Sequence, residues 1–381
     1  MQVSYVKSLI DIINQKIFGT QSAREKLSVE DAEKVFLLAK KHDFAHLVGE
    51  ISGNGEKEIA LNKIIKRERS LALFRFTQQS LELESLKRIL EFNKIDFIPL
   101  KGAVIRGLYP EQWMRTSCDI DVLISKNDLD KAEKALIGVG YKKGEVGLHD
   151  VSFFSQNNVH VELHFTLVEE GFKTLPALET ALINSKKVDG KIFERKLEDK
   201  LFIFYHVYHM AKHFMNGGCG IKPFVDLKLI EQRFKVSEKP FNAMLTESGL
   251  KPFYNAVKAL MAVWFDGAEH SELTLDVEKF ILSGGVYGNQ KQRAAIKQVK
   301  SDGKIKYLLK RLFVGYKELC LSFPSLKKLP FLFPFYQVAR WFKLAFGKDR
   351  KRILNTVKTN ATVTESEKDG VKTLIEQLGL E

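Results

Sequence analysis

The sequence predicts an α+β fold in which a small mixed β-sheet core is flanked by N-terminal and C-terminal helical regions. Three observations lead to this prediction. Helical periodicity fills the first quarter of the chain, short strand-like and helical segments alternate in the next part, and helical patterns return after Gly190. We therefore expect a helical region over 1–93, a mixed core over 94–190 and a second helical region over 191–381.

The first region has the patterns of three helices. Apolar residues between 3 and 17 recur near one helical face, and Ser28 with Asp31 has the spacing of a capped helix start. Residues 56–92 include neither Gly nor Pro and are rich in strong helix formers. We therefore expect one long helix there.

The mixed core begins at Asn93, where the run NKIDFIPLKG predicts a short strand that ends at a glycine turn. The patterns that follow predict a short helix, a strand, a capped helix and two further strands, over 103–109, 119–124, 127–138, 149–156 and 159–165. Beyond Gly190 the clearest helices are expected over 197–215 and 224–234. The tail from Thr364 is expected to be a polar linker followed by a terminal helix.

The composition is that of an ordinary folded protein with two or three domains. The 381 residues are 45% hydrophobic and 28% charged, which excludes a chain that is disordered or collagen-like as a whole. Cys118, Cys219 and Cys320 lie far apart without a CxxC pair, so we expect no disulfide partner and a cytoplasmic location. The N-terminus has the pattern of a helix instead of a signal peptide, and we expect no transmembrane segment.

The sharpest functional feature is the run CDIDVLI at 118–124. Residues two apart in a strand share a face, so Asp119 and Asp121 are expected to project together while Ile120 and Val122 enter the core. Two like charges at the end of an apolar strand repel each other unless a cation lies between them, and Mg²⁺ prefers oxygen ligands. The pair predicts a metal site, and the alternative is a strand end that faces solvent.

A third carboxylate lies in a similar pattern, VHVELHF at 159–165. His160, Glu162 and His164 share one strand face, so Glu162 is expected to join the aspartates from a neighbouring strand. Three carboxylates around one or two Mg²⁺ ions suit nucleotidyl transfer, because the metal binds triphosphate oxygens and stabilises the charge that leaves with pyrophosphate. The alternative is a set of polar residues that face water.

The run from Pro99 to Ala103 predicts a strand-to-helix turn. Gly102 lets the backbone approach a ligand, the helix start can donate N–H groups to phosphate, and Lys101 is the expected phosphate contact. Glycine is also common at such junctions for conformational reasons alone. Arg115 is expected either to contact a phosphate or to form an ion pair that fixes the strand end.

Histidines form a second candidate cluster. His206, His209 and His213 lie on one helical face, but a zinc site there lacks both an HExxH motif and a nearby cysteine. We expect this helix to line the cleft opposite the strands, with His209 and His213 towards the substrate and Asp226 paired with that face. His164 is expected either to contact the substrate or to have a structural role.

The net charge of +13 is concentrated between Lys291 and Lys358, where 18 Lys or Arg residues occur with three acids. Within this part, the segment 304–352 mixes cations with Phe, Tyr and Trp. Three explanations are open for this mixture, in order of preference: packing of the segment against the core, attachment to an anionic membrane surface, and binding of nucleic acid. The inner membrane surface is therefore the alternative location to free cytoplasm.

The order of the motifs resembles the bacterial family described as uncharacterised nucleotidyltransferases, within the DNA polymerase beta-like nucleotidyltransferase superfamily. LKG, LYP, R-x3-DID-x-L, a helix ending in Gly140-Tyr141, and VELH follow one another, and the resemblance extends over most of the chain. The resemblance implies that Asp119, Asp121 and Glu162 hold the metal. It also implies that the nucleotide turn lies at the LKG motif.

Two departures from the superfamily pattern concern the nucleotide turn and the third acid. At the turn, most members have Gly-Ser, whereas this chain has Lys101-Gly102. At the third acidic position, most members have Asp, whereas this chain has Glu162. The predicted function is Mg-dependent transfer of a nucleoside monophosphate from an NTP to an unknown acceptor hydroxyl or other nucleophile. The alternative is a catalytically silent nucleotide-binding or protein-interaction module in a biosynthetic cluster.

Overall fold

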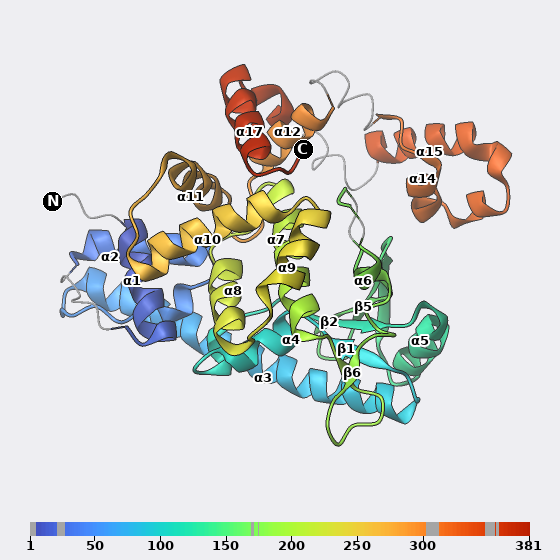
Figure 1. Ribbon diagram of the computed structural model, residues 1–381, viewed down its shortest axis with the longest axis horizontal. Coiled ribbons are helices and arrows are strands. Elements are labelled where there is room, and N and C mark those ends of the chain that lie inside the picture. Colours follow the sequence, from blue (N-terminus) through green and yellow to red (C-terminus); the bar gives the residue numbers. More distant parts are fainter. Residues whose placement is uncertain are drawn as a thin grey trace.

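The computed structural model describes residues 5–20, 27–168, 171–173, 175–301, 312–346, 355 and 358–381. Its centre is a five-stranded mixed sheet in the order β1-β2-β5-β4-β3 (Figure 1). The strands are β1 (Phe97–Pro99), β2 (Asp119–Ile124), β3 (Lys142–Val146), β4 (Asp150–Phe154) and β5 (His160–His164). β2 and β5 are parallel, and the other neighbours are antiparallel. The predicted α+β class is confirmed.

Both faces of the sheet are covered near β2. Ile120, Val122 and Ile124 join one apolar cluster with residues of α3 (Glu56–Phe92) and α5 (Leu129–Gly138). Leu123 points the other way into the main core of the molecule. This alternation leaves the acids of β2 on the side of Leu123, at the end of the strand that precedes it.

The N-terminal helices are α1 (Tyr5–Ile13), a π-helical turn η1 (Asn14–Phe18), α2 (Val29–Lys41), the 3-10 turn η2 (Ala45–Leu47) and α3. α2 begins as predicted, because the Ser28 side chain accepts a hydrogen bond from the Asp31 N–H. The 37 residues of α3 span ~55 Å, from the α1–α2 helices to the underside of the sheet (Figure 1). This helix is therefore shared by the helical region and the sheet.

Short elements connect the strands of the sheet and extend it. They are α4 (Gly102–Ile105), the 3-10 turns η3 (Arg106–Leu108), η4 (Gln112–Met114) and η5 (Lys126–Asp128), α6 (Pro176–Glu179), and the two-stranded ribbon of β6 (Lys186–Lys187) and β7 (Arg195–Lys196). β3 was missing from the sequence prediction. Its residues KKGEV are nearly all exposed on the edge of the sheet, so they lack the apolar alternation that marks a strand.

The C-terminal half is helical. Its helices are α7 (Asp199–Met215), α8 (Lys222–Arg233), α9 (Glu238–Glu247), α10 (Lys251–Asp266), α11 (Glu272–Gly284), α12 (Gln290–Lys300), α14 (Tyr316–Ser322), α15 (Phe333–Phe346) and α17 (Glu365–Gln377), with 3-10 turns η6 (Pro324–Lys327) and η7 (Pro330–Leu332). α7 lies at the centre of the main core, with Phe204, Tyr208 and Phe214 fully buried.

One expectation for the C-terminal half is wrong, and another is tested only in part. The tail from Thr364 is not a linker, because Thr364 is the N-cap of α17 and forms a capping box with Glu367. The basic segment 304–352 is described only over 312–346, and its remaining residues lie outside the described part. Among the described residues, no helix combines the length and the apolar composition needed to cross a bilayer.

Candidate active site

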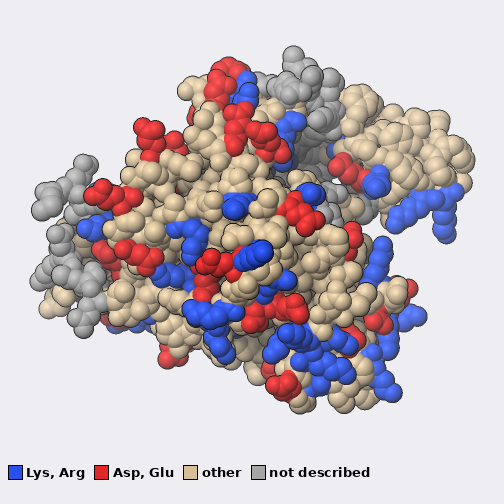
Figure 2. Space-filling model, viewed as in Figure 1, with Lys and Arg blue, Asp and Glu red and all other residues tan. Residues whose placement is uncertain are grey.

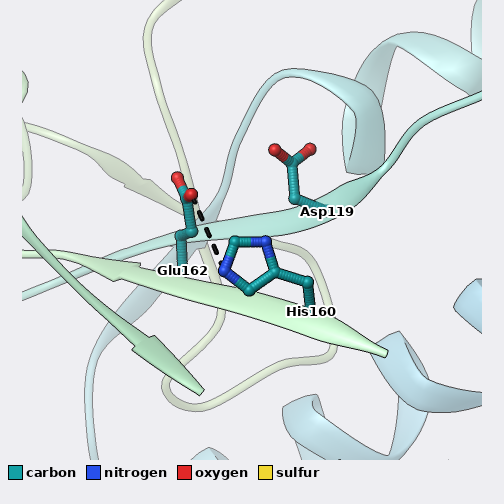
Figure 3. Close-up of side chains that lie close together, drawn as sticks. All are labelled: Asp119, His160 and Glu162. Atoms are coloured by element: carbon teal, nitrogen blue, oxygen red, sulfur yellow. Dashed lines mark ion pairs between the residues drawn. The ribbon is translucent and has the colours of Figure 1, made fainter. Parts of the chain in front are cut away.

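The parallel pairing of β2 and β5 brings the predicted acids together. Asp119 lies opposite His160, Asp121 opposite Glu162, and Leu123 opposite His164. Side chains two apart on each strand share a face, so the carboxylates and both imidazoles project from the same side of the sheet. Figure 3 shows Asp119, His160 and Glu162 on that side, with the His160 Nε2 atom 3.8 Å from Glu162 Oε1.

This group of side chains fits a divalent cation. Two overlapping sets, Asp119-His160-Glu162 and Asp121-Glu162-His164, each have three possible ligand atoms within 4.8 Å of one another. Glu162 belongs to both sets. Carboxylate oxygens suit Mg²⁺ or Mn²⁺, and the imidazoles are ligands that transition metals accept more readily than Mg²⁺ does.

Lys101 reaches into the same group. Its Nζ lies 2.8 Å from Asp121 Oδ1, and the His164 Nε2 lies 2.7 Å from the same oxygen. The two partners surround a carboxylate whose side chain is only 3% exposed. Asp121 thus receives a cation and an imidazole hydrogen bond at one oxygen.

The backbone at Lys101 is strained. Lys101 has φ 44° and ψ −119°, in a region that L-residues rarely adopt and that costs about 1–3 kcal/mol. The next residue, Gly102, has a packing reason of its own. A Cβ there would lie 2.6 Å from both the Arg115 Nη1 and the Ser117 Oγ, so the close approach of the following loop requires glycine.

The pKa values of the two aspartates are shifted in opposite directions. Burial raises the pKa of Asp119 to about 6, and the negative charge of Asp121 adds to the effect. Burial also acts to raise the pKa of Asp121, but Lys101 and the hydrogen bond from His164 outweigh it and hold that pKa below its ordinary value. The hydrogen bond from His164 also lowers the pKa of Glu162. The negative charge of Asp121 is therefore balanced by Lys101 and His164, whereas Asp119 has no partner of comparable strength among the described residues.

Arg115 lies in a buried ion pair. Its Nε and Nη2 donate to the two carboxylate oxygens of Asp226 at 3.0 and 2.8 Å, and the Tyr109 hydroxyl donates to Asp226 at 2.7 Å. The pair ties the loop before β2 to α8. A phosphate contact by Arg115 stays a prediction. The Asp226 oxygens accept hydrogen bonds from Arg115 and Tyr109, so Asp226 does not pair with the histidine face of α7 as expected. Burial lowers the pKa of His206, and the negative charge of Asp226 acts against that shift without a bond between the two side chains.

α7 faces the acids across the site. His209 Nε2 and His213 Nε2 are 2.8 Å apart, whereas His206 Nε2 bonds the Pro223 carbonyl, so the three histidines of this helix do not form one ligand set. Burial lowers the pKa of His209 well below its ordinary value, and the charge of Lys101 is the next cause. His209 is therefore neutral and lies within electrostatic reach of Lys101.

Sequence reasoning missed Tyr287, which reaches the start of β2 from the loop between α11 and α12. Its hydroxyl lies 3.0 Å from the Cys118 Sγ, next to Asp119, and the residue is 75% exposed. Glycines hold this loop in place: Gly285 has φ +66°, and a Cβ there would lie 2.7 Å from the Lys41 carbonyl oxygen. The run GGVYGN signals a close approach, but nothing in it indicates the partner.

A cavity of about 580 Å³ lies beside the start of β2, between α2 and α3. Its acids are paired: Asp43 lies 2.6 Å from Lys222 Nζ and Glu68 lies 2.8 Å from Lys40 Nζ. The cavity is lined by Lys40, Asp43, Ala45, His46, Ile64, Arg67, Glu68, Leu71, Ala72, Arg75 and Thr116. Neither arginine has a hydrogen-bond or ion-pair partner among the residues that the structure describes.

A family model described as "Uncharacterised nucleotidyltransferase" matches residues 28–266, which include every element of the acidic site. The chain belongs to this nucleotidyltransferase family. The family resemblance predicted from the LKG, DID and VELH motifs is confirmed, and so is the enzyme class. The nucleotidyltransferase is also similar to the solution structure of the antibiotic-resistance factor ANT(2'')-Ia, with 12% identity, a TM-score of 0.35, and coverage of 48% of this chain and 96% of that chain. No curated protein matches.

Proposed function

We propose that the enzyme transfers a nucleoside monophosphate from an NTP to an acceptor nucleophile in the cytoplasm, with Mg²⁺ held by Asp119, Asp121 and Glu162. The observation that carries the proposal is the register of β2 and β5, which sets Asp121 beside Glu162 and brings all three carboxylates to one face. When bound, Mg²⁺ would stabilise the negative charge on the triphosphate and on departing pyrophosphate.

The residues around the carboxylates have separate roles in this proposal. His164, which contacts both Asp121 and Glu162, positions the two acids relative to each other. Lys101 balances Asp121 in the free enzyme, and its ammonium group is available to the phosphates once a metal takes over that role. His209, which is neutral, and His213, whose Nε2 lies 2.8 Å from that of His209, form the opposite wall on α7 and offer hydrogen bonds to the substrate.

We infer that the acceptor binds in the cavity beside β2. Thr116, in the cavity wall, precedes Asp119 by three residues, which is ~10 Å of extended chain. Because Asp43 and Glu68 are already paired, the two free arginines leave an excess of positive charge. Arg67 and Arg75 lie ~12 Å apart along α3, and guanidinium groups match carboxylates and phosphates. An acceptor with an anionic group at one end and its nucleophile at the other fits this arrangement.

The experiment is incubation of the enzyme with each α-labelled NTP, Mg²⁺ and a cell extract, followed by identification of the labelled product. Asp119→Asn and Asp121→Asn are the controls, since each removes one carboxylate and leaves the apolar side of β2 intact. Labelled product from the wild type alone supports the proposal. If Mg²⁺ and NTP raise the melting temperature but no acceptor is labelled and no pyrophosphate forms, the chain is the silent nucleotide-binding module instead.

A further inference from the structure

Helices α14 and α15 form a small helical hairpin with its own core, apart from the sheet (Figure 1). Leu319, Cys320 and Leu326 are buried inside it. The inner face of α15 is fixed by hydrogen bonds from Gln337 Nε2 to the Val314 carbonyl at 2.5 Å and from Trp341 Nε1 to the Leu312 carbonyl at 2.7 Å. The orientation of α15 about its own axis follows from these contacts.

The opposite face of α15 is apolar and exposed. Phe335, Val338 and Phe342 are 71%, 44% and 62% exposed, and Phe331, just before the helix, is 73% exposed. At 100° per residue, the three helical members fall within an arc of ~60°. We call these four residues the α15 stripe. A stripe of three exposed phenylalanines needs an apolar environment that neither α14 nor the sheet supplies.

The charge of the hairpin indicates which apolar environment covers the α15 stripe. Residues 312–346 have five cations (Lys317, Lys327, Lys328, Arg340 and Lys343) and one acid, Glu318. Figure 2 shows the hairpin as a largely tan lobe with Lys and Arg side chains gathered along one side. Pairing of two copies of the hairpin would bring together two segments that each have a net positive charge. An anionic lipid surface offers both an apolar layer and negative headgroups, which is the combination that interfacial helices use.

We propose that the α14–α15 hairpin attaches the enzyme to an anionic membrane surface. The α15 stripe lies ~5–10 Å deep at the boundary between headgroups and acyl chains, and the lysines contact the headgroups. The attachment is peripheral. It rests on the exposed face of α15 and on the positive charge of the hairpin, and it is independent of the reaction proposed for the acidic site.

The test is co-sedimentation with vesicles made of equal parts phosphatidylserine and phosphatidylcholine, compared with vesicles of phosphatidylcholine alone. The wild type should bind the acidic vesicles and lose binding as salt rises, because the Debye length falls from ~10 Å at 0.1 M to ~3 Å at 1 M. Phe335→Ser with Phe342→Ser should weaken partitioning roughly tenfold or more. The matched control is Phe92→Ser, whose side chain is 87% exposed at the end of α3.

Lys327→Gln with Lys328→Gln should weaken binding to acidic vesicles by ~30-fold at low salt, since each basic residue near such a surface raises the affinity roughly fivefold. Lys186→Gln with Lys187→Gln in the exposed β6 strand is the control pair. All substituted side chains are on the surface, so unchanged melting temperatures are expected. Three outcomes overturn the proposal: no vesicle binding by the wild type, equal loss in the control variants, or a dimer that depends on the stripe in place of vesicle binding.

Discussion

Asp119→Asn is expected to stabilise the metal-free enzyme. Burial and the neighbouring charge of Asp121 raise the pKa of Asp119 to about 6 from an ordinary value of 3.8. Each pKa unit corresponds to about 1.4 kcal/mol, so the ionised Asp119 side chain lowers the free energy of unfolding by about 2–3 kcal/mol above pH 6. The asparagine has no charge and avoids this penalty.

The size of this stabilisation depends on pH. Between about pH 4 and pH 6 the folded protein keeps a proton on Asp119 that the unfolded chain has released, so stability from this group is present below pH 4 and is lost as pH rises to 6. The gain from Asp119→Asn should therefore be full at about pH 8 and disappear at about pH 4. Mg²⁺ should stabilise the wild type and have a much smaller effect on the variant.

The measurement is urea unfolding of both proteins in a chelator and in Mg²⁺, at the two pH values. Asp121→Asn is the matched control, because Asp121 is held by Lys101 and His164 and its loss leaves a largely buried ammonium without its partner. That variant should lose about 3 kcal/mol. If Asp119→Asn is no more stable than the wild type at high pH without metal, burial and the charge of Asp121 do not raise the pKa of Asp119 as described.

Three further predictions concern the nucleotide turn and the cavity. Lys101→Ala should weaken NTP binding by roughly 1.5–3 kcal/mol in calorimetry, and an unchanged affinity would return Lys101 to a purely structural role. Gly102→Ala should lower the free energy of unfolding by roughly 1–3 kcal/mol, because the new methyl group meets two side chains at 2.6 Å; equal stability in urea would contradict this packing. Arg67→Gln with Arg75→Gln should raise KM for the acceptor while NTP binding stays constant. Arg88→Gln, at an exposed position on the same helix, is the control, and an equal KM for both variants argues against the cavity.

The strands of the site could be predicted because their local pattern was clear. Ile120 and Val122 alternate with Asp119 and Asp121, and this period of two matches the faces that the strand presents. The long helix α3 was equally clear from the absence of Gly and Pro. Local periodicity therefore placed both the acids and the helix beneath them.

Contacts between distant segments could not be predicted in the same way. The ion pair of Arg115 with Asp226 and the contact of Cys118 with Tyr287 each join residues more than a hundred positions apart. No periodicity links such residues, since their meeting depends on how helices pack around the sheet. The edge strand β3 was missed for a different reason, because both of its faces are polar and exposed.

The measurement that tests the central claim most directly compares two labels on the same nucleotide. The enzyme is incubated with Mg²⁺, its acceptor fraction and NTP labelled either at the α-phosphate or at the γ-phosphate. Nucleotidyl transfer predicts that the α-label enters the product, that the γ-label leaves with pyrophosphate, and that Asp121→Asn abolishes both events. Entry of the γ-label into the product, or α-labelling that persists in the Asp121→Asn variant, would contradict the account.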